Sequence, residues 1–279
     1  MQRIVDRRWL VALLLIGLSS SALLAMQRGW GRRGREFNPN ERNGVPVWEH
    51  DSNFQHDAFT FARVIYDSAG GGWGGGWRTD WPDSDLNFSL RLQQLTSLKV
   101  NPQPVQLRLT DPQLFDYPFL YMIEVGGIWL SDAEVQAMRK YCLSGGFIMV
   151  DDFWGDRALF DMLQTLRRVF PDREPREVPL EHEIFQCVYP LKEKPQIPSI
   201  HSWERSGVTY EWNHDGDTRT PHYMAIYDDA GRIVVFLCHN TDLGDGWERE
   251  GENHEYFQEF SVKKSYPMGI NIVTYAMTH

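Results

Sequence analysis

The chain is short of basic residues. Of its 279 residues, 28 are Lys or Arg and 38 are Asp or Glu, which gives a formal net charge of -10 and a pI near 5.4. A nucleic-acid-binding surface needs a basic stripe that replaces the counterions of the phosphates, so this charge balance argues against general nucleic-acid binding. With 42% hydrophobic and 24% charged residues, the composition is that of an ordinary globular protein.

Cysteine is scarce as well. Cys142, Cys187 and Cys238 fall in three different predicted elements, and no CxxC spacing occurs. This excludes the zinc-ribbon and thioredoxin classes. We expect three buried, unpaired thiols; in an exported chain, one disulfide with one free thiol is the alternative.

Phosphate-loop and nucleophile signatures are also missing. The six glycines at 70–72 and 74–76 satisfy GxGxxG trivially, and no GK[ST] follows them, so nucleotide binding is not indicated. This stretch predicts either a flexible surface loop or a mobile lid that carries Trp73 and Trp77 over the edge of a sheet. After the apolar run at 147–150, Phe153 stands where a nucleophile elbow needs Ser or Cys, so covalent Ser or Cys hydrolysis is disfavoured.

A long apolar run occurs at the N-terminus. Three arginines precede residues 9–18, and small residues follow up to Ala25, which is the order of a secretory signal. The apolar span to Met26 can also cross a bilayer, so a retained anchor is the alternative. We predict that residues 1–26, as signal peptide or membrane anchor, contact the membrane at least transiently, and that the protein is exported to the periplasm or cell envelope. Residues 27–57 lack periodicity and predict a flexible linker.

The remaining residues, 58–279, predict a single α/β domain. Apolar strand patterns at 59–66, 105–111, 119–127 and 147–150 alternate with helical patterns at 83–98, at 131–144 with a capping box at Ser131 and Glu134, and at 156–170. This order predicts a doubly wound, mostly parallel sheet flanked by helices. Farther on, the sequence predicts a strand at 184–189, an additional C-terminal β-hairpin at 222–238 and a final helix from Pro267.

The stretch GFIMVDDFWGD at 146–156 indicates where a site would lie. Its uninterrupted apolar run is typical of a strand buried on both faces of a parallel sheet. The run ends in Asp151 and Asp152, at the edge where open α/β sheets carry their ligand crevices. If the strand ending at Cys238 runs parallel to this one, the residues that follow it join the same edge. The acidic and polar residues expected there are Asp67, Glu124, Asp151, Asp152, His239, Asn240 and Asp242.

These residue types allow several chemistries. Carboxylates with an imidazole can bind a divalent metal and activate water, or act as general acid and base. The acidic segment from Asp242 to Glu252 offers oxygen ligands for Ca²⁺ but lacks the spacing of an EF-hand. The same side chains at strand ends also cap helices and fasten loops. The sequence specifies no cofactor and leaves any metal unassigned.

Tryptophan is abundant, with 11 copies, and most lie outside the predicted helices and strands. Loop tryptophans form flat contact surfaces for sugars or protein partners, although the core accounts for some of them. Together with the strand-end residues they give the predicted ligand-binding set: Asp67, Trp73, Trp77, Asp151, Asp152, Trp154, His239, Asn240, Asp242, Asp245 and Trp247.

Four segments carry a family resemblance: LTDPQLFDYPFLYM at 109–122, LSDAEVQAMRKYCLSGGFIMVDDFWG at 130–155, RRVFPDR at 167–173 and HNTDLGDGWE at 239–248. With them, residues 58–279 resemble the bacterial domain of unknown function 4159 family. The resemblance implies a fold similar to class I glutamine amidotransferase-like, flavodoxin-like domains. It also implies an exported or membrane-linked domain, often encoded near MoxR-type ATPases and von Willebrand A proteins. The amidotransferase cysteine has no counterpart, because Phe153 stands in its place, so that activity is not carried over.

These observations lead to three hypotheses. The first is a noncatalytic module of the cell envelope that binds a saccharide or another envelope protein at the C-terminal edge of the sheet. The second is a metal-assisted hydrolase that uses the same carboxylates and histidine. In the third, the strand-end residues only hold loops, and the domain is a scaffold.

Overall fold

A computed structural model of the chain describes residues 42, 44–49, 57–68 and 76–279. The predicted leader at 1–26, most of the predicted linker and Trp73 lie outside the described residues. Within the described residues, no helix combines the length and the apolar character needed to span a bilayer. Residues of the predicted linker that are described contact the domain, since Trp48 Nε1 donates to the carbonyl oxygen of Val100 at 2.7 Å.

The domain is built on a seven-stranded sheet with the order β3-β1-β4-β6-β9-β8-β7. Strands β3, β1, β4, β6 and β9 run parallel to one another, whereas β8 is antiparallel to both β9 and β7. The predicted mostly parallel sheet and the C-terminal hairpin are therefore confirmed. The strands are β1 (Ala62–Ile65), β3 (Val105–Arg108), β4 (Phe119–Ile123), β6 (Phe147–Phe153), β7 (Arg176–Glu177), β8 (His222–Tyr227) and β9 (Ile233–His239), and a separate pair joins β2 (Asp67–Ser68) to β5 (Ile128–Trp129).

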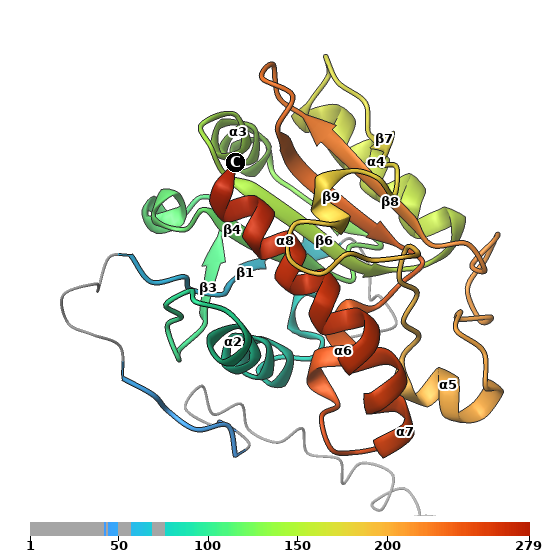
Figure 1. Cartoon of the computed structure of the whole chain (residues 1–279). Coiled ribbons are helices and arrows are strands. Elements are labelled where there is room, and N and C mark those ends of the chain that lie inside the picture. Colours follow the sequence, from blue (N-terminus) through green and yellow to red (C-terminus); the bar gives the residue numbers. More distant parts are fainter. Residues whose placement is uncertain (1–41, 43, 50–56, 69–75) are drawn as a thin grey trace, which may run out of the picture. The chain divides into compact units, whose positions relative to one another are not determined.

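Helices cover both faces of the sheet (Figure 1). Along β4, Tyr121 packs into the core with Phe88 of α2, while Met122 packs into the opposite core with Met138 of α3. From β1 the chain goes outward to β3 and then returns to β4 on the other side of β1. Such a reversal is where doubly wound sheets open a crevice. The helices are α2 (Asp83–Leu95), α3 (Asp132–Leu143), α4 (Gly155–Val169), α5 (Ile200–Ser206), α6 (Leu243–Glu248), α7 (His254–Tyr256) and α8 (Tyr266–Thr278), and a π-helix, Phe257–Ser265, precedes α8.

Local signals account for two of these elements. Residues 147–150 are fully buried in β6, as the apolar run predicts. The capping box of α3 is present, because Ser131 Oγ accepts from the Glu134 N–H at 3.3 Å and Glu134 Oε2 accepts from the Ser131 N–H at 2.8 Å.

The end of β6 is bulged, because the register between β6 and β9 shifts between Val150 and Phe153. A bulge of this kind changes the direction of the last side chains of the strand.

Two sequence predictions about the segment around Cys187 are wrong. Residues 184–189 do not form a strand, because the side chain of Asn271 accepts the N–H groups of Val188 and Tyr189, at 3.1 and 2.8 Å, in place of a neighbouring strand. Cys187 is exposed, whereas Cys142 and Cys238 are buried and all three thiols are unpaired.

Candidate functional site

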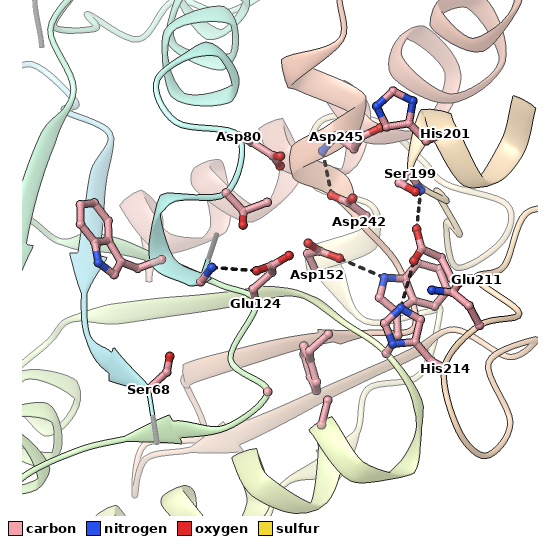
Figure 2. Close-up of a pocket in the computed structure, with 18 of the residues that line it drawn as sticks. Ser68, Asp80, Glu124, Asp152, Ser199, His201, Glu211, His214, Asp242 and Asp245 are labelled. Atoms are coloured by element: carbon pink, nitrogen blue, oxygen red, sulfur yellow. Dashed lines mark hydrogen bonds and ion pairs between the residues drawn. The ribbon is translucent and has the colours of Figure 1, made fainter. Parts of the chain in front are cut away.

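A pocket of about 940 Å³ opens at the carboxyl ends of β1, β4 and β6 (Figure 2). Its walls come from the segments that follow these strands, from residues 76–80, from α5 and the turn at 211–214, and from the start of α6. The pocket lies beside the point where the strand order reverses between β1 and β4. Its volume is in the range of small-molecule sites.

Two carboxylates reach the pocket from neighbouring strand ends. The register pairs Ile123 with Asp151, and the Glu124 N–H donates to the Asp151 carbonyl at 3.2 Å, so Glu124 and Asp152 are neighbours across the ladder. Both have a φ of 50°, and Asp80, on the opposite wall, has a φ of 60°. Residues other than glycine rarely adopt this left-handed region of backbone angles. Those that do cluster at functional sites.

Short hydrogen bonds hold these side chains in place. Glu124 Oε2 accepts from the N–H of Gly76 at 2.8 Å, and Asp152 Oδ1 accepts from the indole N–H of Trp154 at 3.0 Å. The hydroxyl of Tyr66 donates to the carbonyl oxygens of Ile123 and Glu124, at 2.6 and 2.8 Å, and so anchors the end of β4. The two carboxylates are therefore oriented by the fold.

The pocket holds more carboxylates than cations. In the part of the chain that the structure describes, Asp80, Glu124, Asp152 and Asp242 form no ion pair, whereas three other lining acids do. The paired acids are Asp67 with Arg108 at 3.1 Å, Glu211 with His214 at 3.1 Å, and Asp245 with Arg249 at 3.5 Å.

Burial of the unpaired acids perturbs their titration. Desolvation raises the pKa of each of the four, and for Asp152 the negative charges of Glu124 and Glu211 raise the pKa further. A set of desolvated acids that raise one another's pKa is typical of functional sites.

Asp80, Asp245 and Glu248 are the only acids, among the residues that the structure describes, in a group close enough for a single metal ion. One oxygen from each lies within 4.8 Å of the others. However, Arg249 forms ion pairs with both Glu248 and Asp245, and Asp245 Oδ2 already accepts from the Ile200 N–H at 2.6 Å and the Tyr256 hydroxyl at 3.2 Å. The guanidinium thus supplies the positive charge that a metal would bring.

Asp151 does not line the pocket, although its neighbour does. It is fully buried, and its Oδ2 accepts from the Tyr121 hydroxyl and the Gly244 N–H, both at 2.9 Å. Burial raises the pKa of Asp151 to about 7. Although Asp151 belongs to the set predicted to bind a ligand, its carboxylate fastens the start of α6 to the sheet.

His239 and Asn240 also lie behind the pocket. As predicted, β9 runs parallel to β6 and delivers both residues to the same edge, with His239 beside Phe153. Their side chains, however, hold the turn after β6: His239 Nε2 lies 3.0 Å from the Gly155 carbonyl oxygen, and Asn240 Oδ1 accepts from the Gly155 N–H at 2.9 Å. Neither of these two predicted residues therefore lines the pocket.

Trp247, which was predicted to bind a ligand, lies in the core instead of the pocket. Its side chain is 0% exposed and its ring lies 4.4 Å from that of Phe88 and 5.9 Å from that of Tyr121, measured between centroids. A residue in the middle of the core offers no contact surface to a ligand. The predicted residues that do line the pocket are Asp67, Trp77, Asp152, Trp154, Asp242 and Asp245.

Several lining residues were missed from the sequence. Asp80 follows the glycine-rich stretch, and Glu211 and His214 lie in the long connection before β8. No local pattern distinguishes them, since tertiary packing alone brings them to the strand ends. Glu124 did carry a signal, as an acid at the end of an apolar strand.

Replacing Asp152 with asparagine is expected to stabilise the fold at alkaline pH, by about 1 kcal/mol. The amide keeps the acceptor for Trp154 and removes a charge that faces other acids. Because the folded pKa of Asp152 is raised, the stability of the wild type falls as the pH rises from the unfolded value of about 3.9 through the folded value. The gain should therefore be largest at pH 8.5 and vanish near pH 4 in denaturant titrations. An equal gain at both pH values, or a loss at pH 8.5, would contradict this account; Asp116→Asn, at an exposed site, is the control.

The fold and the site define the class: an α/β domain with a doubly wound, mostly parallel sheet and a carboxylate-lined pocket at the C-terminal edge of its strands. Residues 60–277 match the family described as a domain of unknown function (DUF4159), and the chain belongs to this family. The resemblance seen in the sequence is thereby confirmed. No curated protein matches the chain.

Proposed function

We propose that this domain is a noncatalytic ligand-binding module and that its ligand occupies the carboxylate-lined pocket. One observation carries the proposal: Asp80, Glu124, Asp152 and Asp242 come from four separate segments and line one pocket, with no ion-pair partner in the part of the chain that the structure describes. Burying acids without partners lowers stability, so a fold has no structural reason to gather them. A ligand that compensates the charges of these acids would explain why they line one pocket.

A metal-assisted hydrolase is the second candidate, supported by the spacing of Asp80, Asp245 and Glu248. It is the weaker one, because Arg249 occupies that group and because His239, the histidine of the predicted cluster, faces Gly155. Metal analysis of the purified protein separates the two candidates. Stoichiometric metal, together with a hydrolytic activity that a chelator abolishes, would replace the binding proposal.

The cell envelope remains the proposed location. It is supported by the order of basic, apolar and small residues in 1–25, which is that of a secretory signal or anchor. Export would present the pocket to envelope saccharides or to envelope proteins.

The binding proposal predicts a ligand-dependent rise in melting temperature that depends on the pocket acids. We expect at least one compound from a library of saccharides, amino acids and amines to raise the Tm by about 5–10 °C at 100 times its Kd. Glu124→Gln and Asp152→Asn should each weaken that binding at least about tenfold, since each removes a charge but keeps the size of the side chain.

Exposed carboxylates outside the pocket provide matched controls. Glu174→Gln and Asp116→Asn change the same groups and should leave the Tm rise unchanged. The proposal fails if no compound raises the Tm, or if every compound that does so acts equally on the pocket variants and on the wild type.

A further inference from the structure

We infer that the ligand is an organic cation, and that its ammonium or guanidinium group lies among Glu124, Asp152 and Asp242. This inference rests on the proposed function and specifies the chemistry of the same site. The group can come from a free amine or from a Lys or Arg side chain of a peptide. Both sources share the features that the pocket selects: positive charge and several N–H donors.

The first support is an unused acceptor on a buried acid. Asp242 lines the pocket and is only 3% exposed. Its Oδ1 accepts the N–H of Asp245 at 2.7 Å and so caps α6. No donor among the described residues reaches its Oδ2, and because this oxygen is not one of the fully buried atoms that lack a partner, it is open to the pocket. A bound N–H group would satisfy it.

A second unused acceptor lies on the opposite wall. Asp80 Oδ2 is buried and has no hydrogen-bond partner among the described residues. Figure 2 shows Asp80, Glu124, Asp152 and Asp242 around one shared space. Hydrogen-bond capacity is therefore left open on more than one side of the pocket, as a group with several donors requires.

The spacing of the acids favours an organic cation over a metal ion. Oxygens that share one Mg²⁺ or Ca²⁺ at about 2.0–2.6 Å lie within about 5 Å of one another. Glu124, Asp152 and Asp242 do not form such a group in the described part of the chain, where the only group within 4.8 Å is Asp80, Asp245 and Glu248. An ammonium on a carbon chain, or a planar guanidinium with five donors, can bridge acids that are farther apart.

The charge balance of the pocket supports the same conclusion. Of the cationic or ionisable residues that line the pocket, Arg249 and His214 face Asp245 and Glu211. The other two, Arg205 and His201 of α5, form no ion pair with the pocket acids in the described part of the chain. They leave the negative charge at the ends of β4 and β6 uncompensated. A neutral polyol would supply donors to these acids but no charge, so it would leave most of their desolvation cost in place.

Calorimetric titration of the full chain tests this inference. The probes are 1,4-diaminobutane, agmatine and N-acetyl-lysine amide; the neutral isostere is 1,4-butanediol; and Mg²⁺ and Ca²⁺ are titrated alone. We expect at least one cationic probe to bind with one-to-one stoichiometry, and at least about 100-fold more tightly than the diol. Tighter binding of the diamine or agmatine would point to a small amine, and tighter binding of the lysine derivative to a peptide.

Variants in which a pocket carboxylate is replaced by an amide of the same size show where the cationic probe binds. Glu124→Gln, Asp152→Asn and Asp242→Asn should each weaken binding of the cationic probe at least about tenfold, and Asp116→Asn less than twofold. Asparagine at 242 keeps an oxygen that can cap α6, so this variant is expected to fold.

Three results overturn the inference: binding by none of the cationic probes, equal binding of the diol, or occupation of the pocket by Mg²⁺ or Ca²⁺ alone with loss in the same variants. The proposed function survives the first two if another compound in the thermal screen binds through Glu124 and Asp152. If the screen is negative as well, both fail.

Discussion

Replacing Arg63 with methionine is expected to lower the free energy of unfolding by about 3–5 kcal/mol. Arg63 lies in β1, and its guanidinium forms an ion pair with Asp85 of α2; both side chains are 0% exposed. Methionine fills much of the same volume but leaves the Asp85 carboxylate buried without its cation. The loss of charge compensation, rather than a cavity, accounts for the expected effect.

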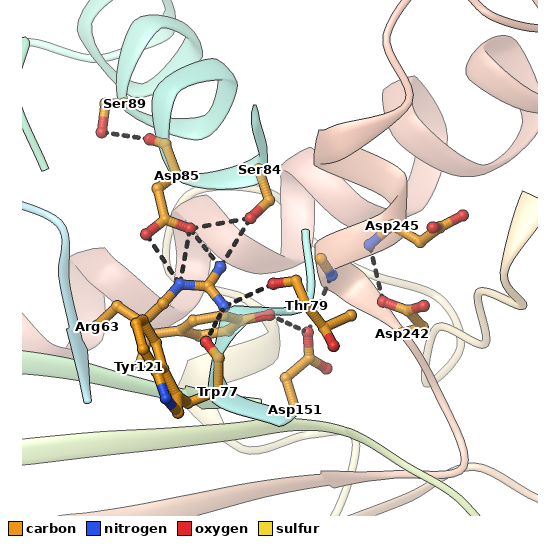
Figure 3. Close-up of polar contacts among 11 residues, drawn as sticks. Arg63, Trp77, Thr79, Ser84, Asp85, Ser89, Tyr121, Asp151, Asp242 and Asp245 are labelled. Carbon is orange, nitrogen blue, oxygen red and sulfur yellow. Dashed lines mark hydrogen bonds and ion pairs between the residues drawn. The ribbon is translucent and has the colours of Figure 1, made fainter. Parts of the chain in front are cut away.

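The same change should disturb the pocket. Figure 3 shows that Arg63 also reaches the segment before α2, where its Nη1 donates to the carbonyl oxygens of Trp77 and Thr79, at 3.0 and 2.8 Å. These bonds hold the chain that carries Asp80. In the folded fraction, we expect ligand binding at the pocket to weaken together with stability.

Urea unfolding of matched variants measures this effect. Arg167→Met, at an exposed site on α4, should change the free energy of unfolding by less than about 0.5 kcal/mol. The double variant Arg63→Met/Asp85→Leu should recover most of the loss, because it removes both charges. A single variant that loses less than 1 kcal/mol, or a double variant no more stable than Arg63→Met, would show that the pair is not the source.

The fold could be predicted because its signals are local. The apolar run at 147–150, the capping box at Ser131 and the hairpin at 222–238 each specify an element from a few neighbouring residues. The alternation of strands and helices then restricts the topology, since connections between parallel strands must cross a face of the sheet. Where a distant side chain replaces a strand partner, as Asn271 does at 188–189, local signals fail.

The sequence predicted which edge of the sheet carries the site, but not which individual side chains line the pocket. Asp151 and Asp152 are adjacent, yet one fastens α6 and the other lines the pocket, because of the bulge in β6 and the positive φ at Asp152. Neither feature has a local sequence signal here. Trp247 is a second example, since the residue type alone does not tell whether a tryptophan contacts a ligand or packs in the core.

Replacing Asn240 with alanine is expected to cost about 3–4 kcal/mol of unfolding free energy. Asn240 is fully buried; it accepts from the Gly155 N–H and donates to the carbonyl oxygens of Asp217 and Thr220, at 2.9 Å in each case. Each lost bond is worth about 1 kcal/mol. The φ of 59° adds a strain of about 1 kcal/mol for alanine, which lacks the local hydrogen bonds that let asparagine tolerate this conformation.

Two companion variants separate these contributions. Asn240→Gly relieves the backbone strain but loses the same three bonds, so it should be more stable than Asn240→Ala by about 1 kcal/mol. Asn240→Asp keeps the acceptor for Gly155 but places a buried carboxylate against the carbonyl oxygens of Asp217 and Thr220, so at neutral pH it should be less stable than Asn240→Ala.

The Kd of the variants distinguishes a structural role of Asn240, which holds the turn after β6, from a role in ligand binding. Because Asn240 does not line the pocket, the Kd of the folded fraction of Asn240→Ala should stay within about threefold of the wild type, whereas Asp152→Asn should lose binding without losing stability. The opposite pattern, with tenfold weaker binding by a fully stable Asn240→Ala protein, would return this residue to the ligand-binding set predicted from the sequence. The pair of variants thus tests whether the edge of the sheet is divided between side chains that build the pocket and side chains that hold the loops behind it.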